Sequence, residues 1–273
     1  MECNVRGIPV FYEETGTGVA VIALHGFTLD HHSLKNSLEP VFAHKEGWRR
    51  IYPDLPGMGR TPGNPELNGS DDMLEVILGF IEAVIPGEEF IVIGESYGGY
   101  LAQGVVARMS SRVQGLGLIC PVEIALHSAR DLPTLTVVHK DPDLVASLTP
   151  EEAAEFTAIA VVQESAILAR FREEVITAVN RADHKFLEKI VQNYAFSFDV
   201  TKLPTPFPKP TLILLGRQDN IVGYKDAWPV LENYPRASFA VLDRAGHNLS
   251  VEQSQLFNSL VEEWLSRVSE SLA

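Results

Sequence analysis

The fold of this chain follows from the stretch Phe90-Ile-Val-Ile-Gly94-Glu95-Ser96-Tyr97-Gly98-Gly99-Tyr100. Its first four residues form a continuous apolar run, which is typical of a strand buried on both faces. A Gly-x-Ser-x-Gly turn follows, and a helical pattern begins directly after it. In this context the turn predicts a nucleophile elbow, which lifts the Ser96 hydroxyl above the sheet. Gly94 and Gly98 lack Cβ atoms, so the strand and the helix can approach closely around the turn.

Outward from this stretch, short β-rich runs alternate with longer helical patterns. The alternation predicts an α/β fold, a mostly parallel central sheet flanked by helices. The expected strands are Val19–Leu24, Arg50–Pro53, Phe90–Ile93, Val113–Ile119, Thr211–Leu215 and Ser238–Leu242. An antiparallel hairpin at the sheet edge is expected from Asn4–Val5 and Pro9–Tyr12. The expected helices are Asp71–Val84, Tyr100–Met109, Tyr224–Asn233 and Glu252–Val268.

One segment, from Pro121 to about Leu203, breaks this rhythm because it contains no strong strand and reads as several helices. Within it, Thr149 and Pro150 suit the start of a helix. Four prolines follow Leu203 within seven positions, and they end the helical pattern: Pro204, Pro206, Pro208 and Pro210. We therefore expect a helical cap (lid) of residues 122–205, inserted into a discontinuous core of residues 1–121 and 206–273. Most of eight apolar residues should form the cap's own small core, and a subset of them should face a substrate cleft: Phe156, Ile159, Val162, Phe171, Phe186, Tyr194, Phe196 and Phe198.

Composition excludes several classes of protein. The 273 residues are 45% apolar and 21% charged, which is ordinary for a globular protein and unlike a disordered or disulfide-stapled chain. The formal charge of −14 argues against nucleic acid and anionic membranes as partners, and weakly against strongly anionic substrates. Cys3 and Cys120 indicate no disulfide framework. The N-terminal residues lack the pattern of a signal peptide, so we expect a cytoplasmic protein.

Four further segments agree with the elbow. They are His25-Gly26-Phe27, Pro53-Asp54-Leu55-Pro56-Gly57-Met58-Gly59-Arg60-Thr61, Gly216-Arg217-Gln218-Asp219 and Ala245-Gly246-His247. With these motifs the sequence resembles the α/β-hydrolase fold superfamily over nearly the whole chain. The order Ser96, Asp219, His247 is the order that this fold uses for its triad.

The resemblance implies a role for each of these residues. Ser96 would be the nucleophile, His247 the general base and acid, and Asp219 the group that orients the imidazole. The main-chain N–H groups of Phe27 and Tyr97 would form the oxyanion hole, with His25, Gly26, Gly94 and Gly98 in supporting positions. No metal or other cofactor is expected, because neither a zinc motif nor a phosphate-binding glycine loop occurs.

Some assignments have alternatives. Glu123 follows the strand Val113–Ile119 at a position where some members of the superfamily carry the acid. Asp30, His31 and His32 are adjacent, and adjacent side chains do not share a face in regular structure, so a metal site is not expected there. Glu95 is expected to be a structural hydrogen-bond partner. His127, His139 and His184 receive no role.

The expected activity is that of a carboxylesterase, which cleaves small to medium apolar esters through an acyl-enzyme. One alternative is a C–C bond hydrolase of meta-cleavage-type dienoates, although the loop His25-Gly26-Phe27-Thr28 lacks the Gly-Pro-Gly common in that branch. Another is a proline iminopeptidase, which would use cap carboxylates to bind the substrate amine. A non-catalytic ligand receptor on the same fold is the alternative from a different class. The expected partner is an apolar small molecule, and a homodimer is compatible with the sequence.

Overall fold

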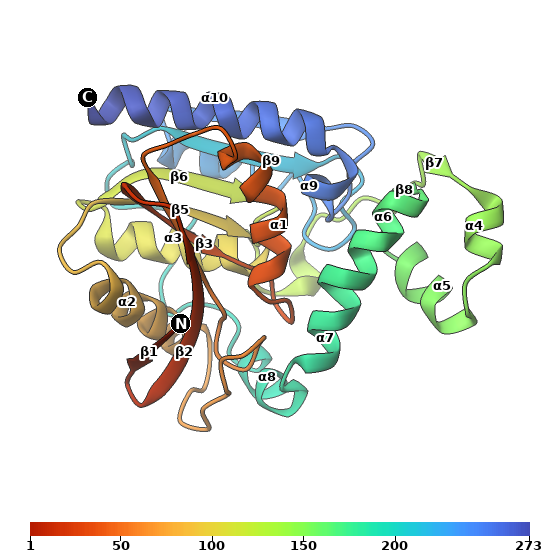
Figure 1. The fold of residues 1–273 in the computed structure, drawn as a ribbon, viewed down its shortest axis with the longest axis horizontal. Coiled ribbons are helices and arrows are strands. Elements are labelled where there is room, and N and C mark those ends of the chain that lie inside the picture. Colours follow the sequence, from red (N-terminus) through yellow and green to blue (C-terminus); the bar gives the residue numbers. More distant parts are fainter.

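An eight-stranded sheet forms the centre of the computed structural model, which describes residues 1–273 (Figure 1). The strands lie in the order β1-β2-β4-β3-β5-β6-β9-β10. Their bounds are β1 (Glu2–Val5), β2 (Ile8–Thr15), β3 (Val19–Leu24), β4 (Trp48–Pro53), β5 (Phe90–Glu95), β6 (Val113–Ile119), β9 (Thr211–Gly216) and β10 (Ala237–Leu242). Every neighbouring pair of strands is parallel except β1–β2 and β2–β4, which are antiparallel and lie at one edge of the sheet. The predicted α/β architecture is confirmed.

Helices cover both faces of this sheet. α1 (His31–Phe42) and the long C-terminal helix α10 (Ser254–Leu272) contact each other on one face, and α2 (Ser70–Val84) and α3 (Tyr97–Met109) lie together on the other (Figure 1). The central strands β3 and β5 are therefore almost fully buried, which explains their continuous apolar sequences. No helix has both the length and the apolar character needed to cross a bilayer.

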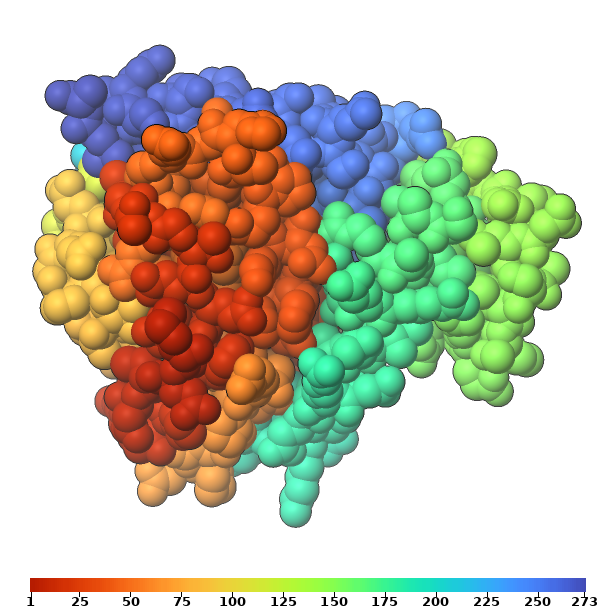
Figure 2. Space-filling view, in the orientation of Figure 1, coloured from red at the N-terminus to blue at the C-terminus, as the bar shows by residue number.

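Residues 122–191 pass beyond the carboxyl ends of the parallel strands and form a lobe at that end of the molecule (Figures 1 and 2), whereas residues 192–205 return along the sheet domain, where the N–H of Phe196 donates to the Tyr100 hydroxyl at 2.8 Å. The elements of this lobe are η1 (His127–Ala129), β7 (His139–Lys140), α4 (Pro142–Ala146), α5 (Pro150–Thr157), β8 (Val162–Gln163), α6 (Ser165–Arg170), η2 (Phe171–Ile176), α7 (Thr177–Arg181) and α8 (His184–Val191). α5 begins as its sequence predicts, because the Thr149 hydroxyl accepts the Glu152 N–H at 3.2 Å. The short parallel pair β7–β8 was not expected.

The apolar residues of this segment divide between two clusters. Phe156, Val162 and Phe171 belong to a small cluster of six buried residues inside the lobe. Phe186 and Phe196 instead join the main core of 65 buried residues. The expectation that most of them form a separate cap core is therefore wrong, because the chain after α7 returns to pack on the sheet domain.

The expected helix Tyr224–Asn233 is wrong as well. Only a short 3₁₀ turn, η3 (Pro229–Asn233), forms there. Pro229 lacks an N–H and its ring clashes with the carbonyl four residues earlier, so it disfavours a continuous α-helix at this position. Lys225 is also held by an ion pair with Asp131 at 2.9 Å, far away in the sequence. The expected helix Glu252–Val268 forms as α10, which begins at Ser254, and a separate short helix, α9 (Leu249–Glu252), precedes it.

Candidate active site

Ser96 lies between the end of β5 and the start of α3, in a conformation that non-glycine residues rarely adopt. Its φ is 53° and its ψ is −115°. A Cβ atom on Gly94 would lie 2.2 Å from the carbonyl oxygen of Gly98, and one on Gly98 would lie 1.9 Å from that of Leu24. Both distances are far below van der Waals contact. Only glycine at these two positions allows the strand and the helix to meet as closely as they do.

The structure brings Ser96, His247 and Asp219 into one hydrogen-bonded chain. His247 Nε2 lies 3.0 Å from Ser96 Oγ, and His247 Nδ1 lies 2.9 Å from Asp219 Oδ2. A carboxylate only accepts hydrogen bonds, so Nδ1 carries the proton and Nε2 is free to accept one from Ser96. The other oxygen of Asp219 accepts the N–H groups of Ile221 and Val222 at 2.9 and 3.0 Å. These bonds fix the carboxylate beside the imidazole.

The electrostatics of the pair favour an ionised Asp219. Its burial acts to raise its pKa, but His247 and the two main-chain N–H groups outweigh burial and hold the pKa below its usual value. Burial acts to lower the pKa of His247, and the charge and hydrogen bond of Asp219 raise it above its usual value. Asp219 therefore stabilises the imidazolium that forms when His247 accepts a proton.

The two residues expected to form the oxyanion hole, Phe27 and Tyr97, both have main-chain N–H groups that are free to bind an oxyanion. The N–H of Phe27 donates to no acceptor in the protein. The N–H of Tyr97 belongs to the first turn of α3, where helical N–H groups have no acceptor within the helix. The rings of Phe27 and Tyr97 pack edge to face with centroids 5.2 Å apart, which ties the loop after β3 to the elbow.

His25 braces the loop after β3 and lies in the protein interior. Its Nε2 accepts the N–H of Leu55 at 3.0 Å, and its Nδ1 donates to the carbonyl oxygen of Gly26 at 2.8 Å. Burial lowers the pKa of His25, so the ring is neutral and can make both bonds. The imidazole thus connects the loop that carries Phe27 to the loop after β4.

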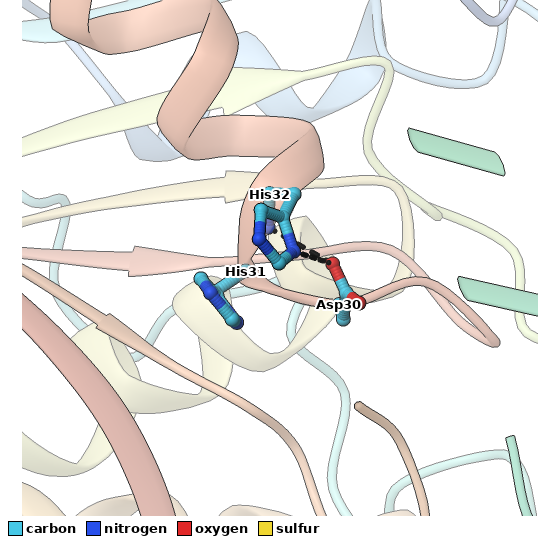
Figure 3. A group of neighbouring side chains, drawn as sticks. All are labelled: Asp30, His31 and His32. Atoms are coloured by element: carbon cyan, nitrogen blue, oxygen red, sulfur yellow. Dashed lines mark hydrogen bonds and ion pairs between the residues drawn. The ribbon is translucent and has the colours of Figure 1, made fainter. Parts of the chain in front are cut away.

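Asp30, His31 and His32 come together at the start of α1, although the sequence argument kept them apart (Figure 3). The two imidazole rings lie 4.0 Å apart between centroids. Asp30 is the N-cap of α1 and has an extended backbone, so the helical spacing of side chains does not apply to it. Hydrogen bonds hold both rings, because His31 Nδ1 contacts Asp54 and His32 Nδ1 contacts Asp30, each at 2.8 Å. Asp30 also accepts the main-chain N–H of His32 at 3.0 Å, so Asp30 caps the helix and the two rings are held beside it.

Glu123 is the alternative acid from the sequence, but Asp219 makes the hydrogen bond to His247. Glu123 is buried, and neither of its carboxyl oxygens has a hydrogen-bond partner in the protein. Burial raises its pKa to about 8. Glu123 is thus a protonated carboxyl group at neutral pH.

Glu95 is the buried neighbour of Ser96. Its Oε2 has no hydrogen-bond partner in the protein, so this oxygen does not make the predicted structural hydrogen bond. Burial raises its pKa to about 7, and its charge acts on that of His247. Glu95 lines the cavity above Ser96 and also a small neighbouring cavity that contains Arg170 and Glu174.

Glu252 has a structural role that the sequence did not predict. One of its carboxyl oxygens accepts the N–H groups of Val161 and Val162 at 2.6 and 3.2 Å, and the other accepts that of Gly246 at 2.7 Å. Gly246 directly precedes His247. Glu252 thus holds the histidine loop to the lobe. No sequence signal pointed to it, because a glutamate near a helix end is common.

A cavity of about 230 Å³ lies above Ser96 and His247. Its apolar walls come from both parts of the chain, with Phe27 and Val222 from the sheet domain and Ile159 and Val175 from the lobe. The charged groups among its lining residues are Glu95 and Arg130, and no carboxylate from the lobe lines it. Arg130 was also missed by the sequence reading.

Comparison with known proteins agrees with this fold. The family described as alpha/beta hydrolase fold matches residues 19–254. The sequence is 26% identical to a 2-hydroxy-6-oxononadienedioate/2-hydroxy-6-oxononatrienedioate hydrolase of Burkholderia vietnamiensis, over 94% of this chain and 91% of that protein.

Two solved structures share the fold. One is an alpha/beta superfamily hydrolase from Oenococcus oeni, with a TM-score of 0.88 and 29% identity over 98% of this chain and 99% of the other. The other is a malate-bound thermophilic esterase from Thermogutta terrifontis, with a TM-score of 0.70 and 26% identity over 98% and 97% of the two chains. The chain belongs to the α/β-hydrolase fold family, and it is a hydrolase.

Proposed function

We propose that this hydrolase cleaves carboxylic esters through an acyl-enzyme on Ser96. The observation that carries the proposal is the hydrogen bond of 3.0 Å between His247 Nε2 and Ser96 Oγ, at the base of a cavity of about 230 Å³. An alcohol is a weak nucleophile until a neighbouring base removes its proton. His247 is in position to do so, and Asp219 is in position to stabilise the resulting imidazolium.

The proposed reaction has two halves. In the first, Ser96 Oγ attacks the ester carbonyl while its proton passes to His247 Nε2, and the carbonyl oxygen becomes an oxyanion. The N–H groups of Phe27 and Tyr97 stabilise this oxyanion, a contribution of about 3–4 kcal/mol per donor in comparable sites. The C–O bond to the alcohol then breaks, and His247 gives its proton to the leaving oxygen. In the second half, water attacks the acyl-enzyme by the same route and frees the acid.

A second candidate is hydrolysis of a 2-hydroxy-6-oxo-dienedioate by C–C bond cleavage. The Burkholderia vietnamiensis relative is named as a hydrolase of a 2-hydroxy-6-oxo-dienedioate, and its 26% identity to this chain supports this candidate. The third possibility from the sequence, a proline iminopeptidase, needs carboxylates for the substrate amine. The lobe instead contributes the cation Arg130 to the cavity, which disfavours an ammonium group there.

The test combines a fluorophosphonate probe with a panel of substrates. We expect the probe to label the wild-type protein at Ser96. The variants Ser96→Ala and His247→Ala should remain unlabelled. The panel pairs nitrophenyl esters of rising chain length with a 2-hydroxy-6-oxo-dienedioate and a prolyl-anilide. The highest kcat/KM on an ester supports the proposal, and a higher value on the dienedioate replaces it with the second candidate. Absence of labelling together with absence of turnover would indicate a ligand receptor.

A further inference from the structure

Arg130 differs from the other arginines that are at least partly buried. Each of those others pairs with a carboxylate: Arg49, Arg50, Arg112, Arg170 and Arg267. Arg130 forms no such ion pair. Its guanidinium donates to the main-chain carbonyl oxygens of Ile124, Ile221 and Ala125, at 2.8, 2.9 and 3.2 Å.

These hydrogen bonds leave Arg130 without a carboxylate in direct contact, and the charges of Asp219 and Asp226 act on it only from farther away. A guanidinium has five N–H groups and stays protonated. Three of them donate to carbonyl oxygens, so one N–H remains on each terminal nitrogen. Burial lowers the pKa of Arg130, which reflects the unfavourable transfer of this cation out of water. Buried charges are normally paired, and a planar anion that accepts two parallel hydrogen bonds is the natural partner of a guanidinium.

The position of Arg130 shows where such a partner would come from. Arg130 lines the cavity above Ser96, and with Tyr194 it also lines a second cavity of about 580 Å³. The second cavity has the exposed side chains of Leu126 and Val191 in its wall. Arg130 thus lies where the catalytic cavity and an outer, partly apolar cavity share their lining. A bound molecule that reaches from Ser96 toward the outer cavity passes the guanidinium.

We propose that Arg130 binds a free carboxylate of the substrate, so that the preferred substrates are esters that also carry a carboxylate group. This inference rests on the proposed ester hydrolysis at Ser96. It also replaces the expectation of a purely apolar substrate. The net charge of −14 is spread over the chain, and exposed charges are screened within about 8–10 Å in physiological salt. The cation in the cavity wall acts on the substrate at contact distance.

The test compares two esters of nearly equal size. One is the mono-4-nitrophenyl ester of adipic acid, which carries a free carboxylate, and the other is the same ester with that carboxylate converted to a neutral primary amide. In a second pair of esters, the carboxylate or the amide is carried by the alcohol part of the ester and not by the acyl part. The measured quantity is the ratio of kcat/KM for the anionic ester to kcat/KM for its neutral partner. We expect this ratio to exceed roughly 10 in at least one pair, since a charge-assisted hydrogen bond is lost in the amide.

Variants then assign the preference to one residue. Arg130→Met should lower the ratio by roughly 10- to 100-fold, and Arg130→Lys should restore part of it. Arg172→Met is the matched control, because it removes a cation from the lobe that pairs with Glu152 at the surface and does not line the cavity. The ratio of the control should equal that of the wild type.

Three results would overturn the inference. The first is a wild-type ratio near one in both pairs of esters, and the second is an unchanged ratio in Arg130→Met. The third is an equal loss of kcat/KM on both esters of a pair in Arg130→Met. The last would show that Arg130 only braces the loop of Ile221. Fluorophosphonate labelling of Ser96 separates these results from failure of the proposed function. A labelled enzyme without an anionic preference contradicts the role of Arg130 alone, whereas an unlabelled enzyme contradicts ester hydrolysis.

Discussion

Glu252 Oε1 accepts a hydrogen bond from the main-chain N–H of Val161 at 2.6 Å, across 91 positions of sequence. The bond joins α9, which follows the histidine loop, to the lobe beyond the sheet. Because the second oxygen of the same carboxylate holds Gly246 at 2.7 Å, the position of His247 depends on where the lobe lies. The lobe therefore does more than cover the cavity.

Glu252→Gln should destabilise the protein. A glutamine side chain offers one acceptor oxygen, so at least one buried N–H at Gly246 or Val161 loses its partner. An unpaired buried N–H costs about 1–3 kcal/mol, which corresponds to a Tm lower by roughly 2–10 °C. Thermal unfolding followed by circular dichroism measures this shift. The control is Glu262→Gln, an exposed position on α10. Equal Tm values in the two variants would show that the contacts of Glu252 contribute nothing.

Asp219→Asn should lower kcat on a nitrophenyl ester by roughly 10⁴-fold with little change in Tm, because the amide no longer fixes the productive imidazole tautomer. Steady-state kinetics and a thermal melt give the two quantities. Glu123→Gln is the comparison, because Glu123 was the alternative acid. Its kcat should stay within a few-fold of the wild type. A large loss in Glu123→Gln with an active Asp219→Asn would reverse the assignment.

Glu123 should make the stability of the protein depend on pH. Burial raises its pKa from 4.5 to about 8, so between these values the folded state holds a proton that the unfolded state releases. The stabilisation is complete below pH 4.5 and is lost as the pH rises through about 8.

Glu123→Gln does not titrate, so it isolates this effect. From pH 5 to pH 8 the wild type should lose on the order of 2–4 kcal/mol of unfolding free energy relative to the variant. Urea denaturation at both pH values provides the measurement. An exposed carboxylate, tested with Glu89→Gln, should show no such difference. If wild type and Glu123→Gln change in parallel, the carboxyl is already ionised in the folded state.

Glu95 should shift the pH dependence of catalysis. Its negative charge raises the pKa of His247, and His247 must be neutral to accept the proton of Ser96. Glu95 is ionised only in part around its pKa of about 7, so Glu95→Gln removes a partial charge, and the acid limb of kcat/KM on a neutral ester should move slightly to lower pH. Glu89→Gln, an exposed position that does not line the cavity, serves as the control. An acid limb that stays in place or moves to higher pH would show that Glu95 does not act on His247.

Local sequence chemistry was sufficient for the sheet and for the elbow. The strands Val19–Leu24 and Val113–Ile119 have the predicted bounds. Their boundaries follow from apolar runs bounded by loop residues, which act within a few positions. The turn at Ser96 is determined in the same way, because Gly94 and Gly98 alone permit the close approach of strand and helix. At Tyr224–Asn233 the helix prediction was wrong, because Pro229 disfavours a continuous α-helix and only a short 3₁₀ turn forms.

The sequence by itself determined the order of Ser96, Asp219 and His247 and the fold that brings the ends of their strands together. Only the tertiary structure decided which buried charges have partners. Glu252 meets three main-chain N–H groups, and Arg130 meets three carbonyl oxygens and no carboxylate. Both outcomes depend on how the lobe meets the sheet domain. A charged residue takes its role from the groups that surround it in space, and residue type and spacing do not specify those groups.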